Sequence, residues 1–169
     1  MLPIITHLMK LITLFVSVVL MGFFTDIASL RKQYIAAAES EQEANELHQQ
    51  LEKVDETGKE FTKLGYKSAA IVLQAKYAKG LLTKKNLFTK GVKLLDATID
   101  RAPNNYEVRL LRLNIQENAP GITGYTKNIK EDKAFLIKNY NSQPADLREF
   151  TKDFVEVSES FTKQEKALF

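Results

Sequence analysis

The chain has 169 residues, of which 44% are hydrophobic and 27% charged, and these values suit a single globular domain. The absence of cysteine excludes disulfides, cysteine-ligated zinc, iron–sulfur clusters and thiol nucleophiles. Seven glycines and four prolines are few for a turn-rich β-sandwich, and the net charge is only +3. The composition therefore favours a domain without a cofactor, and it identifies no substrate.

Residues 1–25 differ in composition from the rest of the chain. The run from Leu11 to Phe24 is apolar and uncharged, and Lys10 precedes it. As a helix this run would span about 21 Å, which is short for a membrane span of about 30 Å and typical of a signal peptide. We therefore expect an export signal, with an uncleaved N-terminal anchor as the alternative. Without a cysteine after the run, a lipoprotein anchor is excluded, and we expect the mature chain in the periplasm or cell envelope.

From residue 26 onward, apolar residues recur three or four positions apart, which predicts helices rather than strands. Ser40 and Glu43 have the spacing of a capping box, while Gly80 and Pro103 mark helix ends. We predict one all-α domain over residues 26–161, a compact antiparallel bundle of about six to seven helices, followed by a frayed tail over 162–169. The expected helices cover residues 27–38, 40–54, 61–79, 86–102, 106–117, 128–140 and 144–161.

Part of this pattern resembles a known repeat family. Gly91, Leu95, Thr98 and Pro103 have the spacing of the second helix of a tetratricopeptide repeat, and residues 102–108 are similar to the turn between two repeats. The match ends after one repeat. The stretch from about residue 30 to residue 140 more closely resembles short, exported, functionally uncharacterised helical proteins of Bacteroidetes-type bacteria. The resemblance implies a tetratricopeptide-like fold and an envelope location, but no activity.

The residues that usually carry catalysis are scarce. His48 is the sole histidine beyond residue 25, and the chain has no glycine-rich phosphate loop. The glutamates at positions 39, 41, 43 and 46 are typical of a solvated acidic face rather than a metal site. We therefore expect no catalytic residue, no metal and no enzymatic activity. A carboxylate-dependent hydrolase stays an alternative, because two distant acidic residues can meet in a fold.

The charges are segregated along the chain. Residues 39–60 hold eight acidic residues and two lysines, whereas residues 61–95 hold eight lysines and no acidic residue. Two interpretations follow: neighbouring helices attract each other, or an exposed basic patch meets anionic lipid or an acidic partner. Nucleic acid is not expected, because the patch lacks interleaved aromatic residues. The candidate patch consists of Lys76, Lys79, Lys84, Lys85, Lys90 and Lys93.

The helix expected over residues 106–117 has two apolar sides, and Arg109, Arg112 and Gln116 line a polar gap between them. Arginines flanked by buried surface need partners, because an unpaired buried charge is costly. They either pair with Asp or Glu of a neighbouring helix or hold the carboxylate of a peptide in a groove.

Tyr66 and Tyr77, on an adjacent helix, would add aromatic contacts to such a groove. The sequence thus predicts a non-enzymatic scaffold or adaptor that binds a peptide or protein partner in the cell envelope. The alternative is a membrane-surface protein that uses the lysine patch.

Overall fold

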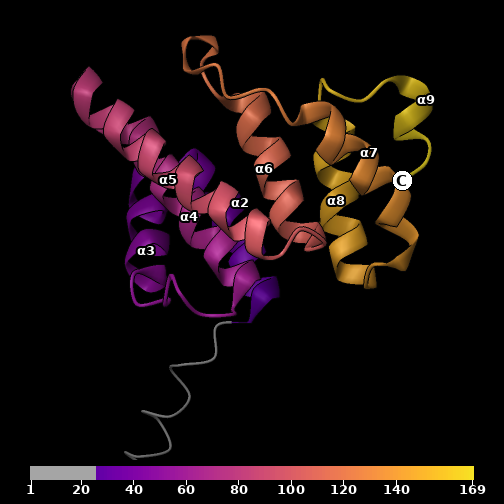
Figure 1. Cartoon of the computed structure of the whole chain (residues 1–169), viewed down its shortest axis with the longest axis horizontal. Coiled ribbons are helices and arrows are strands. Elements are labelled where there is room, and N and C mark those ends of the chain that lie inside the picture. Colours follow the sequence, from indigo (N-terminus) through magenta and orange to yellow (C-terminus); the bar gives the residue numbers. More distant parts are fainter. Residues whose placement is uncertain (1–25) are drawn as a thin grey trace, which may run out of the picture.

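The computed structural model describes residues 26–169, and every regular element among them is helical (Figure 1). This confirms the predicted all-α bundle; the export signal predicted over residues 1–25 lies outside the described residues. The helices are α2 (Ile27–Glu39), α3 (Glu41–Leu51), α4 (Phe61–Tyr77), α5 (Leu81–Arg101), α6 (Tyr106–Asn118), α7 (Ile129–Asn139), α8 (Ala145–Val157) and α9 (Lys163–Lys166), with short 3₁₀ turns η1 (Gly121–Thr123) and η2 (Tyr140–Ser142).

Helix α6 lies between two groups of helices, α2–α5 on one side and α7–α9 on the other (Figure 1). Its two predicted apolar sides enter two separate cores. The side formed by Val108, Leu111 and Ile115 packs into the core of α2–α5. The side formed by Tyr106, Leu110 and Leu113 packs against α7, α8 and the C-terminal segment. The helix is therefore buried along almost its whole circumference.

Small residues allow α4 to pack closely on both α5 and α6. A Cβ added to Gly91 of α5 would lie 2.6 Å from Val72 Cγ2 and 2.9 Å from the carbonyl oxygen of Ser68 on α4. A Cβ added to Gly65 of α4 would lie 2.9 Å from Val108 Cγ2 on α6. Both glycines are thus required by the approach of the neighbouring helix.

We expect Gly91→Ala to lower the free energy of unfolding by about 1–3 kcal/mol, because the clash with α4 backbone outweighs the better helix propensity of alanine. Gly121→Ala is the control, since nothing lies within 4 Å of a Cβ added there. That change should stay within about 0.5 kcal/mol in urea unfolding. Equal effects of the two substitutions would contradict close packing of α4 on α5.

The starts of α3 and α5 can be compared with the starts predicted from the sequence. The N–H of Glu43 donates to Ser40 Oγ at 3.4 Å, so the Ser40 half of the predicted capping box of α3 is present. Helix α5 begins at Leu81, earlier than the predicted residue 86. Its first turn projects past the end of α4 (Figure 1), and residues 81–86 are all exposed, so this turn lacks the buried positions on which the prediction is based. The turn is helical because it extends the packed part of α5.

The prediction of a frayed tail over residues 162–169 is wrong. Thr162 and Glu165 form a complete capping box at the start of α9. The ring of Phe169 packs edge-on against Tyr140, at 4.8 Å between centroids, and against Phe161, at 5.4 Å. The spacing of Thr162 and Glu165 is a sequence signal that the prediction does not use. The segment is held by its terminal aromatic residue and also by the ion pair between Lys133 Nζ and Glu165 Oε1 at 2.9 Å.

Candidate functional site

The arginines of the candidate groove are paired inside the domain. Arg112 holds Asp132 of α7 with two donors, Nε to Oδ2 at 2.6 Å and Nη2 to Oδ1 at 2.7 Å. Arg109 Nη1 donates to Asp132 Oδ1 at 2.9 Å and to Glu131 Oε1 at 2.7 Å. Asp132 is fully buried, and both arginines are less than 10% exposed. The geometry therefore agrees with the first of the two interpretations, in which the arginines pair with acidic residues of a neighbouring helix.

Gln116 completes this cluster on α6. Its Nε2 lies 3.4 Å from Asp132 Oδ2, and its Oε1 accepts the N–H of Asn128 at 2.9 Å, just before α7 begins. Burial opposes a positive charge on Arg112, but the hydrogen bonds and charge of Asp132 outweigh it, and the pKa of Arg112 is raised. The cluster thus joins α6 to α7. The guanidinium groups of Arg109 and Arg112 are occupied by its carboxylates and are not free to hold a peptide carboxylate.

The hydroxyl groups of the two tyrosines are also bound inside the domain. Tyr66 is fully buried, and its hydroxyl donates to Glu107 Oε1 at 2.6 Å. Burial, followed by the charge of Glu107, raises the pKa of Tyr66 well above its usual range. Tyr77, three turns further along α4, donates its hydroxyl to the carbonyl of Ala38 at 2.9 Å and fastens the end of α2. The expected binding groove of Tyr66, Tyr77, Arg109, Arg112 and Gln116 is therefore wrong.

A second buried ion-pair network was missed by the sequence analysis. Arg31 of α2 donates Nε and Nη2 to the two oxygens of Glu107, at 2.8 and 2.9 Å, and Nη1 to Asp146 of α8 at 2.6 Å. Glu107 is 5% exposed. No local pattern identifies this pairing, because the partners are 76 residues apart in the chain. A signal did exist for the first cluster, since Asp132 falls in register with the apolar Ile129 and Leu136 of α7.

The lysine patch, in contrast, is exposed to solvent. All six of its lysines are exposed, and none forms an ion pair with any carboxylate of residues 26–169. The acidic segment reaches the lysine-rich segment through two other pairs, Glu60–Lys63 and Glu56–Lys67. The two charged segments therefore do not neutralise each other at the patch.

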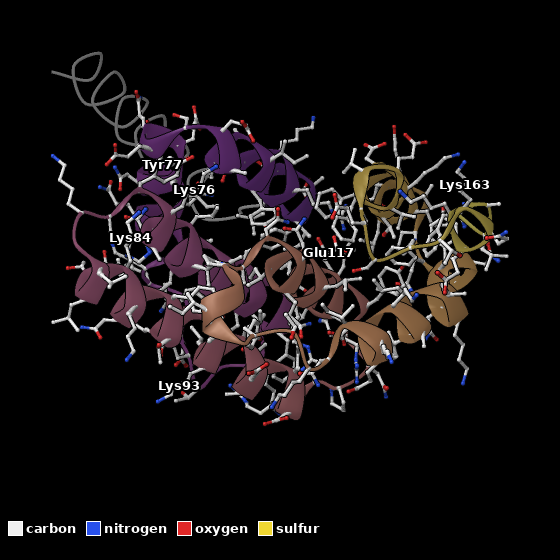
Figure 2. All side chains as sticks on the ribbon, turned by 90° about the horizontal axis from the view of Figure 1, so that it is seen from above. Lys76, Tyr77, Lys84, Lys93, Glu117 and Lys163 are labelled. Atoms are coloured by element: carbon white, nitrogen blue, oxygen red, sulfur yellow. The ribbon has the colours of Figure 1, made fainter. Side chains whose placement is uncertain are left out.

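Two of the patch lysines also close helix ends. Lys76 Nζ donates to the carbonyl of Ala38 at the end of α2, and Lys84 Nζ donates to the carbonyl of Lys76 at 3.1 Å, at the end of α4. Such contacts satisfy terminal carbonyls and place positive charge at the negative end of the helix dipole. Figure 2 shows Lys76, Tyr77 and Lys84 close together at this end of the molecule, with Lys93 further along α5.

Exposed leucines lie beside these lysines at the start of α5. Leu81 is 83% exposed and Leu82 is 71% exposed. Leu81 continues the inward stripe of Phe88 and Leu95 at seven-residue spacing, but α4 has already ended at Tyr77 and none of residues 26–169 covers it. We call the projecting group formed by Lys79, Leu81, Leu82, Lys84 and Lys85 the α5 tip.

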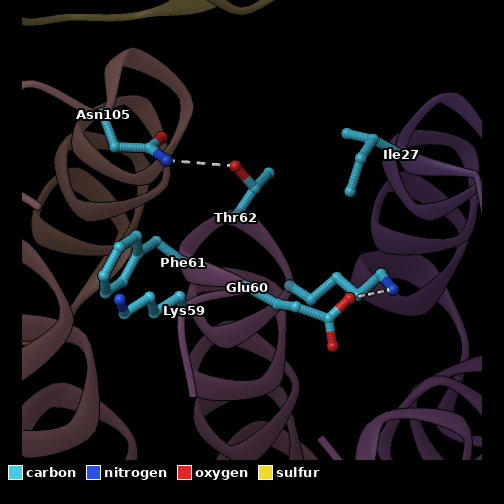
Figure 3. A pocket seen from close by; sticks show the side chains of 7 residues that line it. Ile27, Lys59, Glu60, Phe61, Thr62 and Asn105 are labelled. Carbon is cyan, nitrogen blue, oxygen red and sulfur yellow. Dashed lines mark hydrogen bonds and ion pairs between the residues drawn. The ribbon is translucent and has the colours of Figure 1, made fainter.

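An open depression lies at the opposite end of α4 (Figure 3). Its polar groups are largely occupied: Asn105 Nδ2 donates to Thr62 Oγ1 at 3.1 Å, and Lys63 pairs with Glu60.

Within residues 26–169 no group of three or more His, Asp or Glu side chains is placed to hold a metal ion. None of the helices described is long and apolar enough to cross a membrane. The α5 tip is thus an exposed surface on which two leucines lie beside lysines that pair with no carboxylate of residues 26–169.

Comparison with protein-family models, with curated proteins and with solved structures finds no match to this chain.

Proposed function

We propose that this chain is a non-enzymatic, exported helical protein that binds an anionic membrane surface in the cell envelope through the α5 tip. The observation that carries the proposal is that two exposed leucines lie, at a projecting helix end, beside lysines that form no ion pair with any carboxylate of residues 26–169. The apolar run in residues 1–25 supports export. The close α4–α5 pair supports the tetratricopeptide-like description of the middle of the chain.

The shape of the tip favours a bilayer over a protein groove as its partner. The first turn of α5 projects past the end of α4, so it can enter an interface but cannot enclose a peptide (Figure 1). Leucines that enter the boundary between headgroups and acyl chains gain the hydrophobic free energy of burial, and basic residues around them meet anionic headgroups. Each lysine near such a surface contributes about 1 kcal/mol. Binding of this kind is reversible and depends on salt.

The lysine contribution is tested by co-sedimentation with vesicles of phosphatidylglycerol and phosphatidylcholine in equal parts. Lys79→Gln with Lys85→Gln removes two charges, so we expect affinity to fall about 30-fold, the equivalent of about 2 kcal/mol. Lys138→Gln with Lys163→Gln removes the same charge from exposed sites on α7 and α9 and should change affinity less than about threefold. About 0.5 M salt should release the wild-type protein, because screening then acts within a few Å.

The leucine contribution is tested separately with Leu81→Ser and Leu82→Ser. Both side chains are exposed, so the melting temperature should not fall while vesicle binding is lost. Binding that is equally strong on pure phosphatidylcholine, or unchanged in both tip variants, would overturn the proposal. A failure of the wild-type protein to bind any vesicle would overturn it too and would leave an acidic protein as the partner to seek.

A further inference from the structure

A second apolar projection lies on the same face of the molecule as the α5 tip. Ile122 is 97% exposed, and the whole stretch Pro120–Gly124 around it is exposed and uncharged. The turn η1 rises beyond the end of α6, at the side of the bundle from which α5 also projects (Figure 1), and it faces the viewer in Figure 2. Two separate segments that carry exposed aliphatic residues thus project from the same side of the bundle.

The loop holds Ile122 in a defined position. The N–H of Thr123 donates to the carbonyl of Pro120 at 2.8 Å, and that of Gly124 to the carbonyl of Gly121 at 3.1 Å. Gly124 has φ +62°, a left-handed conformation that glycine adopts without strain. A loop closed by its own hydrogen bonds presents its apolar side chain at little further entropic cost on binding.

The base of this loop is fastened directly to α5. The hydroxyl of Tyr125 donates to Asp96 Oδ1 at 2.8 Å, and its ring packs edge-on against Phe88, with centroids 6.0 Å apart. Phe88 and Asp96 belong to the helix that carries the α5 tip. The position of Ile122 relative to Leu81 and Leu82 is therefore set by packed residues.

We infer that Ile122 is a second membrane contact, which enters the lipid interface beside the α5 tip and fixes the orientation of the bundle on an anionic bilayer. This inference rests on the proposed function. The exposed Lys127 and Lys130 follow the loop and supply the positive charge that such a surface attracts, as the lysines do at the α5 tip. One contact would leave the bundle free to rotate about it, whereas two contacts restrict the rotation.

The absence of tryptophan from the chain provides a direct test. Single tryptophans are introduced as Leu82→Trp, Ile122→Trp and, as a control at the opposite end of α4, Phe61→Trp. With vesicles of phosphatidylglycerol and phosphatidylcholine, we expect the emission of the first two to shift to shorter wavelength and to be quenched by brominated lipid. The emission of Phe61→Trp should not change.

The outcomes separate the inference from the proposed function. A shift for Leu82→Trp without a shift for Ile122→Trp would overturn the second contact and keep the first; no shift for either would overturn both. In the binding assay, Ile122→Ser should weaken vesicle affinity on the order of tenfold, whereas Ile122→Leu should retain it. An Ile122→Ser variant that binds as the wild type does would also contradict the inference. Because Ile122 is almost fully exposed, neither variant should lower the melting temperature.

Discussion

Replacement of Asp132 by alanine is expected to lower the free energy of unfolding by about 3–5 kcal/mol. Asp132 is fully buried and accepts hydrogen bonds from Arg109, Arg112 and Gln116. Removing it leaves two guanidinium groups in the interior, with Glu131 and Asp96 as their remaining carboxylate partners, and both of those are partly exposed. The desolvation of the arginines is then no longer compensated. Urea unfolding followed by circular dichroism measures the loss.

Glu131 provides the matched control, because it is the neighbouring carboxylate and also pairs with Arg109. Its side chain is 57% exposed, and an exposed ion pair contributes about 0–1 kcal/mol. Glu131→Ala should therefore cost less than about 1 kcal/mol. The double variant Arg109→Ala with Arg112→Ala should also be strongly destabilised. If that variant kept wild-type stability, the arginines would be free for a ligand, and the internal pairing described above would not hold.

Part of the cluster around Asp132 is predictable from the sequence. The two apolar sides of α6 and the need of its arginines for partners follow from periodicity and from the cost of a buried charge. The identity of the partner does not follow, because any of the 21 acidic residues is chemically suitable. The choice depends on how α7 packs on α6. That packing includes contacts such as the Arg109 guanidinium over the ring of Phe135, at 4.6 Å.

The α5 tip marks a different limit. The segregation of charge was visible in the sequence, and the exposure of the six lysines agrees with a patch rather than with neutralisation between helices. The role of Leu81 was not visible, because its spacing to Phe88 and Leu95 is that of a core residue. It is exposed because α4 ends at Tyr77, before it would reach that position. The relative lengths of two packed helices decide whether such a leucine is in the core or on the surface.

The buried arginines and the exposed lysines have different roles in this bundle: the arginines connect helices, and the lysines carry charge at the surface. Arg31, Arg109 and Arg112 have planar, forked guanidinium groups that suit bidentate pairing with a carboxylate, and all three are used between helices. The patch lysines have flexible ammonium groups that remain hydrated at the surface. The exposed lysines therefore suit a partner that is attracted by positive charge and needs no fixed hydrogen-bond geometry, such as a layer of anionic lipid headgroups.

The second large effect is expected from Glu107→Ala, which should also lower the free energy of unfolding by about 3–5 kcal/mol. Glu107 accepts two hydrogen bonds from Arg31 and one from the hydroxyl of Tyr66. Without it, the buried Tyr66 hydroxyl has no acceptor, and Arg31 has only Asp146, whose side chain is 59% exposed. Asp146→Ala is the control and should cost less than about 1 kcal/mol, because that partner is exposed.

A triple variant shows why Glu107→Ala is destabilising: either the network itself stabilises the fold, or its removal in part leaves a buried charge without a partner. Arg31→Met, Tyr66→Phe and Glu107→Leu remove every polar group of the network together and keep similar side-chain volume. Replacing a whole buried network by apolar residues is often neutral or stabilising, so the triple variant should be more stable than Glu107→Ala alone. A triple variant that unfolds as easily as Glu107→Ala would mean that the network itself stabilises the fold. Arg31 joins α2 to α6 and α8, so in that case the ion pairs would hold α2 to the second half of the bundle.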